Sequence, residues 1–118
     1  MKLQSLLLEM TINSLQDAMI TKYPGLKLIL SYNRMGNYLQ IDQIIVPTDL
    51  RNTGIGTNVI KNILKYADEN LMKVSLTPSS DYGGNKNRLN KFYQSLGFVK
   101  NSGKNKDFET RDTLIYLG

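Results

Sequence analysis

Histidine and cysteine are both absent from this chain of 118 residues. Without cysteine the chain can form neither a disulfide bond nor a thiolate metal site. Without histidine it lacks the commonest general base, the Ser-His and Cys-His nucleophile systems, and most zinc sites. We therefore expect no metal. Any chemistry must use carboxylates, tyrosines, hydroxyls, lysines, backbone groups or water.

Long apolar runs are also missing. The longest run near the start, Leu6-Leu7-Leu8, is followed at once by Glu9, and no small-residue cleavage site comes after it. The run is too short and too polar for a membrane span or a signal peptide, so we expect a cytoplasmic protein with no membrane partner. The length and the apolar fraction of 41% predict one globular domain over residues 1–118.

The net charge of +5 comes entirely from the second part of the chain. Residues 1–50 carry four basic and four acidic residues, whereas residues 51–118 carry eleven basic and six acidic residues. Between Tyr82 and Lys106 there are six basic residues and no acidic one. This asymmetry indicates an anionic partner, either a phosphorylated cofactor or nucleic acid, and a solvated basic face explains it equally well.

The hydrophobic pattern predicts three helices and five strands. Apolar residues at a spacing of three and four indicate the helices, and alternation with β-branched residues indicates the strands. In chain order these elements cover residues 3–21, 26–33, 38–46, 57–71, 72–76, 87–96, 98–100 and 113–117. The order predicts an α+β domain in three layers, with a mixed, mostly antiparallel sheet and helices on both faces.

The stretch Arg51-Asn52-Thr53-Gly54-Ile55-Gly56 lies between a predicted strand and a predicted helix. A helix N-terminus has four free backbone N–H groups and a positive dipole end. Gly54 and Gly56 remove the side chains that would block a ligand, and Arg51 adds a fixed positive charge. The turn is therefore suited to a phosphate or a pyrophosphate.

Two well-known phosphate-binding turns do not match this stretch. A P-loop needs Gly-Lys-Ser/Thr, but Gly56 is followed by Thr57-Asn58. A dinucleotide fingerprint needs a third glycine where this chain has Val59, and it needs a parallel β-α-β start where this chain has a hairpin. The pattern that does match is Arg/Gln-x-x-Gly-x-Gly/Ala between a strand and a helix.

With this pattern, residues 38–118 resemble the GNAT superfamily of acyl-CoA-dependent N-acetyltransferases. The family's order is present: a strand, Val-Pro, the glycine turn, a helix, a strand, a second helix with Phe92-Tyr93, Leu96-Gly97-Phe98, and a final hairpin. The glycine turn alone is moderately specific. The stretch "KFYQSLGF" (Lys91–Phe98), about forty residues later, makes the resemblance strong.

The resemblance implies an enzyme that moves an acetyl group from acetyl-CoA to a primary amine of a small molecule or a protein. Backbone N–H groups of the turn would hold the pyrophosphate, and the preceding strand end would pair with the pantetheine arm and polarise the thioester carbonyl. Asn85 and Lys91 would lie near the cofactor. The residues implied to bind it are Ile44, Ile45, Val46, Arg51, Asn52, Thr53, Gly54, Ile55, Gly56, Thr57 and Asn87.

The resemblance also implies two catalytic residues. Tyr93 matches a tyrosine that often protonates the leaving thiolate in the family, and packing beside the buried stripe of its helix is the alternative. Several members have a glutamate eleven residues before the first position of the turn, but this position is Gln40, which cannot accept a proton. Asp42 shares that strand face and is the candidate general base, although an ordinary solvent-facing aspartate fits equally well.

Other functions stay open at this point. The family commonly has a strand and one or two helices before its central hairpin, whereas here one helix comes first, so the acceptor groove is either more open or completed by a second subunit of a homodimer. Gln40 also fits a non-catalytic module of the same fold that binds acyl-CoA or a partner. A nucleic-acid partner is disfavoured, because Phe92 and Phe98 among the lysines are better explained as core.

Overall fold

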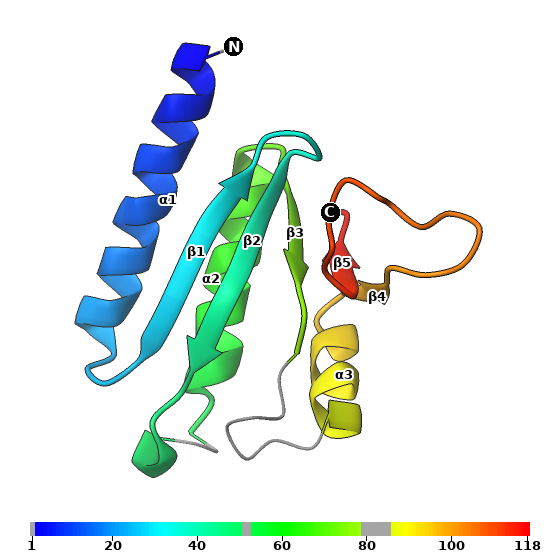
Figure 1. Cartoon of the computed structure of the whole chain (residues 1–118). Helices are drawn as coiled ribbons and strands as arrows, with labels where there is room; N and C mark the ends of the chain where they lie inside the picture. The colour runs from blue at the N-terminus through cyan, green and yellow to red at the C-terminus, as the bar shows by residue number, and fades with distance from the viewer. Residues whose placement is uncertain (1, 51–52, 79–85) are drawn as a thin grey trace.

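A computed structural model of the chain describes residues 2–50, 53–78 and 86–118 (Figure 1). Its helices are α1 (Lys2–Lys22), α2 (Ile55–Glu69) and α3 (Lys86–Ser95), with a 3-10 turn η1 (Thr48–Leu50) before α2. Its strands are β1 (Lys27–Asn33), β2 (Tyr38–Ile45), β3 (Lys73–Leu76), β4 (Val99–Lys100) and β5 (Leu114–Tyr116). The predicted order of helices and strands is confirmed.

The five strands form one mixed sheet in the order β1-β2-β3-β5-β4. β2 and β3 are parallel, and the other three neighbouring pairs are antiparallel. The prediction of an α+β domain with a mixed, mostly antiparallel sheet is therefore confirmed. The parallel pair arises because α2 connects β2 to β3 and returns the chain to its starting end.

The hydrophobic core lies between α1, α2 and one face of the sheet. The apolar stripe of α2 is buried as predicted, against alternate residues of β2 and β3. The Thr11 and Tyr66 side chains are hydrogen-bonded, so α1 and α2 are neighbours on this face. The buried residues of α2, β2 and β3 in this core are Val59, Ile60, Ile63, Leu64, Ala67, Leu39, Ile41, Val74 and Leu76.

β1 lies at the edge of the sheet, and α1 covers part of that edge. The Leu30 backbone N–H donates to the Gln16 side-chain oxygen of α1 at 2.8 Å. Edge strands carry backbone groups that no neighbouring strand satisfies. Gln16 provides an acceptor for one of them from within the same chain.

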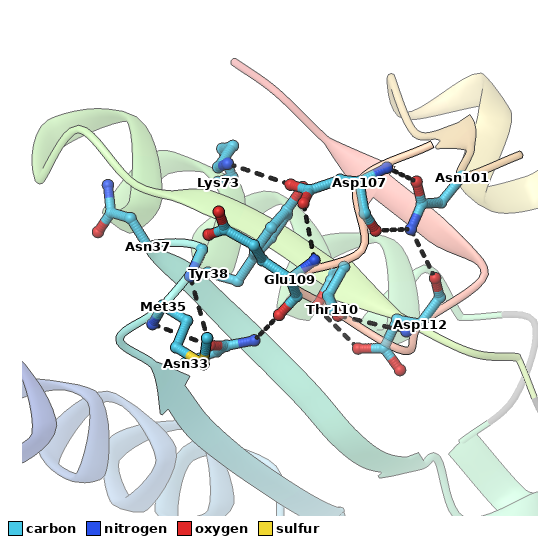
Figure 2. A network of polar contacts seen from close by, with 12 residues as sticks. Asn33, Met35, Asn37, Tyr38, Lys73, Asn101, Asp107, Glu109, Thr110 and Asp112 are labelled. Atoms are coloured by element: carbon cyan, nitrogen blue, oxygen red, sulfur yellow. Dashed lines mark hydrogen bonds and ion pairs between the residues drawn. The ribbon is translucent and has the colours of Figure 1, made fainter. Parts of the chain in front are cut away.

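The opposite face of β2 and β3 is covered by a polar connection, residues 101–113, and not by a helix over this part (Figure 2). The fully buried Tyr38 donates its hydroxyl to Asp107 at 2.7 Å. Lys73 Nζ lies 3.5 Å from the same carboxylate oxygen and 4.3 Å from the Tyr38 ring centroid. Asn101 donates to the Asp107 and Asp112 carbonyls and accepts from the Asp107 N–H. These bonds hold the connection in one conformation on the sheet.

The contacts of Asp107 make the stability of the fold sensitive to acid. The Tyr38 hydroxyl and the Glu109 backbone N–H donate to its carboxylate and hold its pKa below the ordinary value. A depressed pKa means that this carboxylate stabilises the fold above its unfolded-state pKa of about 3.9. The contribution is lost as the pH falls through the lower pKa of the folded state.

We expect Asp107→Asn to lower the free energy of unfolding by about 1 kcal/mol at pH 7, since the lost bonds involve a charge but are partly exposed. Urea denaturation at several pH values measures this. The difference from the wild type should shrink as the pH falls below about 4, where the wild-type carboxylate also becomes neutral. Glu109→Gln, two residues along the same turn, is the matched control and should change little. A difference that stays constant with pH would contradict this account.

Candidate functional site

β2 and β3 lie side by side over only part of β2. Their pairing joins Tyr38–Ile41 to Lys73–Leu76, and β3 ends there while β2 continues to Ile45. Among the described strands, Ile44 and Ile45 pair only with β1. From Asp42 to Ile45 the other edge of β2 therefore has no partner among the described strands (we call it the open edge), and an extended ligand can pair with it as an additional strand would.

α2 begins shortly after this open edge. Gly54 is its N-cap, with φ 84° in the left-handed region and no capping bond from a side chain. The Asn58 N–H donates to the Gly54 carbonyl at 3.0 Å, as the first turn of the helix closes. The N–H groups of Ile55, Gly56 and Thr57 come before this bond, in the turn where a helix has no internal acceptor for them. The positive end of the helix dipole favours an anion at this place.

Gly54 and Gly56 differ in whether the backbone conformation of the turn requires glycine. Gly54 has a positive φ, which a residue with a Cβ atom adopts only with strain. Gly56 has no positive φ, and among the described residues a Cβ atom built there would touch Val46 Cγ2 at an ordinary 3.7 Å. Packing against the described residues therefore does not require glycine at position 56.

The other residues predicted to bind the cofactor divide between the described and the undescribed parts. Thr53 lies in the turn and donates its hydroxyl to the Leu50 carbonyl at 2.5 Å. Asn87 and Lys91 are exposed and lie about one turn apart on α3. Figure 1 shows the end of β2 and the starts of α2 and α3 at the same end of the molecule. The predictions for Arg51, Asn52 and Asn85 lie outside the described residues.

Tyr93 lies in an aromatic cluster on α3. Its side chain is 6% exposed, and its ring meets those of Phe92 and Phe98 edge-on, with centroids 5.1 and 5.7 Å away. Burial raises the pKa of Tyr93 to about 12. The hydroxyl therefore remains protonated at neutral pH and can donate a proton but not accept one. Tyr93 therefore packs in the core, and its hydroxyl stays protonated there.

Asp42 does not have the position that strand alternation predicts. Ile29 lies opposite Gln43 and Leu30 lies opposite Ile41, so Asp42 is the extra residue of a β-bulge. A bulge interrupts the alternation of side chains between the two faces, and the spacing no longer places Asp42 with Gln40. The Asp42 side chain is exposed, and within residues 2–50, 53–78 and 86–118 no hydrogen bond joins it to Gln40.

The carboxylate that does reach Gln40 belongs to Asp112. Gln40 Nε2 donates to Asp112 Oδ2 at 3.3 Å. The Ser75 hydroxyl donates to the same oxygen at 2.7 Å, and the Thr77 hydroxyl donates to Oδ1 at 2.8 Å. No sequence pattern points to Asp112, because it lies in the polar connection of residues 101–113, which has no periodicity. Only the pairing of Leu76 with Leu114 brings it beside the end of β3.

The part of the chain that the structure describes has neither a metal cluster nor a membrane-spanning helix. No group of three or more acidic residues there could hold a metal ion. None of the helices described combines the length and the apolar character that crossing a membrane requires.

The sequence matches one family model, described as an acetyltransferase (GNAT) domain, over residues 8–110. A search of curated protein sequences gives no match. Among solved structures, the chain resembles the anti-CRISPR protein AcrVA5, with a TM-score of 0.58 and 22% identity over 78% of this chain and 90% of that one. It also resembles an acetyltransferase of the GNAT family from Staphylococcus aureus Mu50, with a TM-score of 0.57 and 17% identity. That match covers 79% of this chain and 60% of the S. aureus chain. At these identities the structural matches support the fold.

Proposed function

Because the chain belongs to the GNAT acetyltransferase family, we propose that it transfers an acetyl group from acetyl-CoA to a primary amine of a small molecule or a protein. The observation that carries this proposal is the open edge of β2 next to the start of α2, where a Cβ atom at Gly56 would come no closer than 3.7 Å to a described neighbour. An extended ligand arm can pair with the first, and an anion can occupy the second. Acetyl-CoA has both parts.

The chain's own groups have distinct tasks in this proposal. The backbone N–H groups of Ile55, Gly56 and Thr57 hold the pyrophosphate, together with Thr53, Arg51 and Asn52. Ile44, Ile45 and Val46 pair with the pantetheine arm, and an N–H group of this strand end polarises the thioester carbonyl. Asn87 contacts the cofactor from α3. These placements follow the family pattern, and Arg51 and Asn52 lie outside the described residues.

The transfer itself needs one proton removed and one supplied. The amine nitrogen attacks the thioester carbon, the C–N bond forms, and the C–S bond breaks. Tyr93 donates its hydroxyl proton to the departing thiolate, the role that the family pattern implies for it, and its raised pKa keeps the hydroxyl protonated before that step. The amine releases a proton to a base or to water.

Isothermal titration of acetyl-CoA into the purified protein tests the cofactor assignment. We expect a dissociation constant of about 1–100 μM, in the range of cofactor concentrations at which enzymes commonly work. ADP is the control, because a merely basic surface attracts any phosphate-bearing anion. No binding of acetyl-CoA, or equal binding of ADP, would contradict the proposal.

Tyr93→Phe tests the proposed role of Tyr93 as the proton donor to the departing thiolate. The substitution keeps the ring and its edge-on contacts but removes the hydroxyl, so the melting temperature and acetyl-CoA binding should be unchanged. The rate of CoA release with amine acceptors should fall about 100-fold, the smaller end of what a general acid contributes. A thiol-reactive dye measures the release. An unchanged rate would limit Tyr93 to packing.

A non-catalytic module that binds acetyl-CoA is the second candidate. The observation that favours it is the amide of Gln40 where several family members have a carboxylate, with Asp42 displaced onto a bulge. A panel of amines separates the two candidates. Tight binding of acetyl-CoA with no CoA release above the buffer rate would favour the module.

A further inference from the structure

We propose that Asp112 supplies the negative charge of the acceptor-amine site, and that Gln40 and Thr77 present neutral oxygen atoms beside it. This inference rests on the proposed function and names the residues that recognise its second substrate. The ligand class is a primary ammonium group, which enters beside the fork where β2 and β3 separate.

The Asp112 carboxylate lies beside the last residue pairs of β2 and β3. Gln40 lies opposite Ser75 in the parallel pair, and the next pair, Ile41 with Leu76, is the last. Thr77 follows directly. Asp112 receives hydrogen bonds from Gln40, Ser75 and Thr77, so its carboxylate lies at the point where the open edge of β2 begins. The proposed thioester position is along that edge.

Gln40 is oriented by Asp112. Its side-chain nitrogen donates to Asp112, because a carboxylate can only accept. The amide oxygen must therefore face away from Asp112. Across the described ranges no donor is recorded for that oxygen, so Gln40 offers a half-buried acceptor of fixed direction. Asp112 acts here as a positioning residue as well as a charge.

The Thr77 hydroxyl also contacts Asp112. Its proton is committed to Asp112, and its oxygen accepts the Thr113 N–H at 3.2 Å. A hydroxyl oxygen has two acceptor positions, so one remains. Thr77 is exposed, at the end of β3. The site then offers an ammonium group, which has three donors, two oriented neutral acceptors and a negative charge.

The charge of Asp112 is the last feature of the site. The chain has five more basic than acidic side chains, yet in the described part Asp112 has no cationic partner, and the one ion pair recorded there is Lys73 with Asp107. Hydroxyl and amide donors orient the Asp112 carboxylate without neutralising it. A half-buried, oriented and unneutralised carboxylate favours an incoming cation.

The test compares Asp112→Asn with the double variant Gln40→Glu/Asp112→Asn. The double variant exchanges the amide and the carboxylate. Position 40 then carries the negative charge, and the amide at position 112 can donate the hydrogen bond between the two side chains. The probe is n-butylammonium, titrated while the side-chain amide signals of the isotope-labelled protein are followed by NMR. Tetramethylammonium, which has the charge but no N–H donor, is the ligand control.

We expect Asp112→Asn to weaken n-butylammonium binding about tenfold or more, in line with the loss of one charge-assisted hydrogen bond. The double variant should recover binding to within about threefold of the wild type. The KM for n-butylamine should follow the same order, whereas the affinity for acetyl-CoA should not change. Asp17→Asn makes the same chemical change at an exposed position of α1 and should have no effect. Gln40→Leu, which removes only the oriented amide, should also weaken binding and serves if Asp112→Asn does not fold.

The outcomes distinguish this inference from the proposed function. Absence of acetyl-CoA binding would reject the acetyltransferase but leave the ammonium titration interpretable. Normal acetyl-CoA binding with equal n-butylammonium binding in the wild type and Asp112→Asn would overturn the assignment of Asp112. So would a wild type that does not bind n-butylammonium, or an equal effect from Asp17→Asn.

Discussion

We expect Gly36→Ala to lower the free energy of unfolding by about 3 kcal/mol, the upper end of the usual cost of overpacking a filled site. A Cβ atom at Gly36 would lie 2.6 and 2.8 Å from two ring carbons of Tyr38, and 3.2 Å from Glu109 Cβ. The Tyr38 ring cannot move away easily, because its hydroxyl is bonded to Asp107 and Lys73 lies over its face. The turn before β2 can pass the ring only with glycine at this position.

Thermal denaturation measures this effect, and a loss of about 3 kcal/mol corresponds to a shift of about 10 °C for a domain of this size. Met35→Ala is the matched control. Met35 is the preceding residue of the same turn and is 82% exposed, so its truncation should change the stability by less than about 0.5 kcal/mol. Equal melting temperatures for Gly36→Ala and the wild type would show that the turn and the Tyr38 ring are not in contact in solution.

We expect Gly56→Glu to weaken the binding of acetyl-CoA while leaving the stability of the fold nearly unchanged. Among the described residues a Cβ atom at this position would touch Val46 Cγ2 at 3.7 Å, and an acidic residue in the first turn of a helix is electrostatically favourable. Replacing glycine inside a helix also removes an entropic cost. We therefore expect the variant to melt within a few degrees of the wild type. Its affinity for acetyl-CoA should nevertheless fall about 100-fold, because the carboxylate would occupy and repel the pyrophosphate.

Gly56→Ala provides the control for that result. It adds the Cβ atom without the charge, and the related turns of the family have glycine or alanine at this place. Its affinity should stay within about threefold of the wild type, and its stability should rise by about 0.5–1 kcal/mol. Titration calorimetry measures both affinities. Wild-type binding of acetyl-CoA by Gly56→Glu would place the pyrophosphate elsewhere.

The elements of the fold could be predicted because each carries its own local signal. The apolar stripe of α2 and the alternation of apolar and polar residues in β1 and β2 extend over whole elements. Residues typical of turns lie between these elements. The glycine turn was also recognisable, since its pattern is contiguous. The prediction of its place between β2 and α2 is confirmed.

The acidic part of the candidate site could not be predicted in the same way. Asp42 was chosen from a two-residue spacing, but a bulge depends on the register of two strands and leaves no clear mark in one of them. Asp112 lies 72 residues from Gln40, and it reaches that side chain only through the pairing of β3 with β5. Spacing arguments apply within one element, whereas this contact joins β2 to the segment before β5, with β3 between them in the sheet.

The bond between Gln16 and Leu30 has a consequence for the behaviour of the protein at high concentration. β1 is an edge strand whose Ile29 side chain is 48% exposed, and such a strand is a template on which another molecule's strand can align. The Leu30 N–H already donates to Gln16 of α1. An incoming strand would therefore lack one backbone hydrogen bond to β1, or would first have to displace Gln16. A single glutamine on the first helix thus helps to keep separate copies of the chain from joining edge to edge into fibrils.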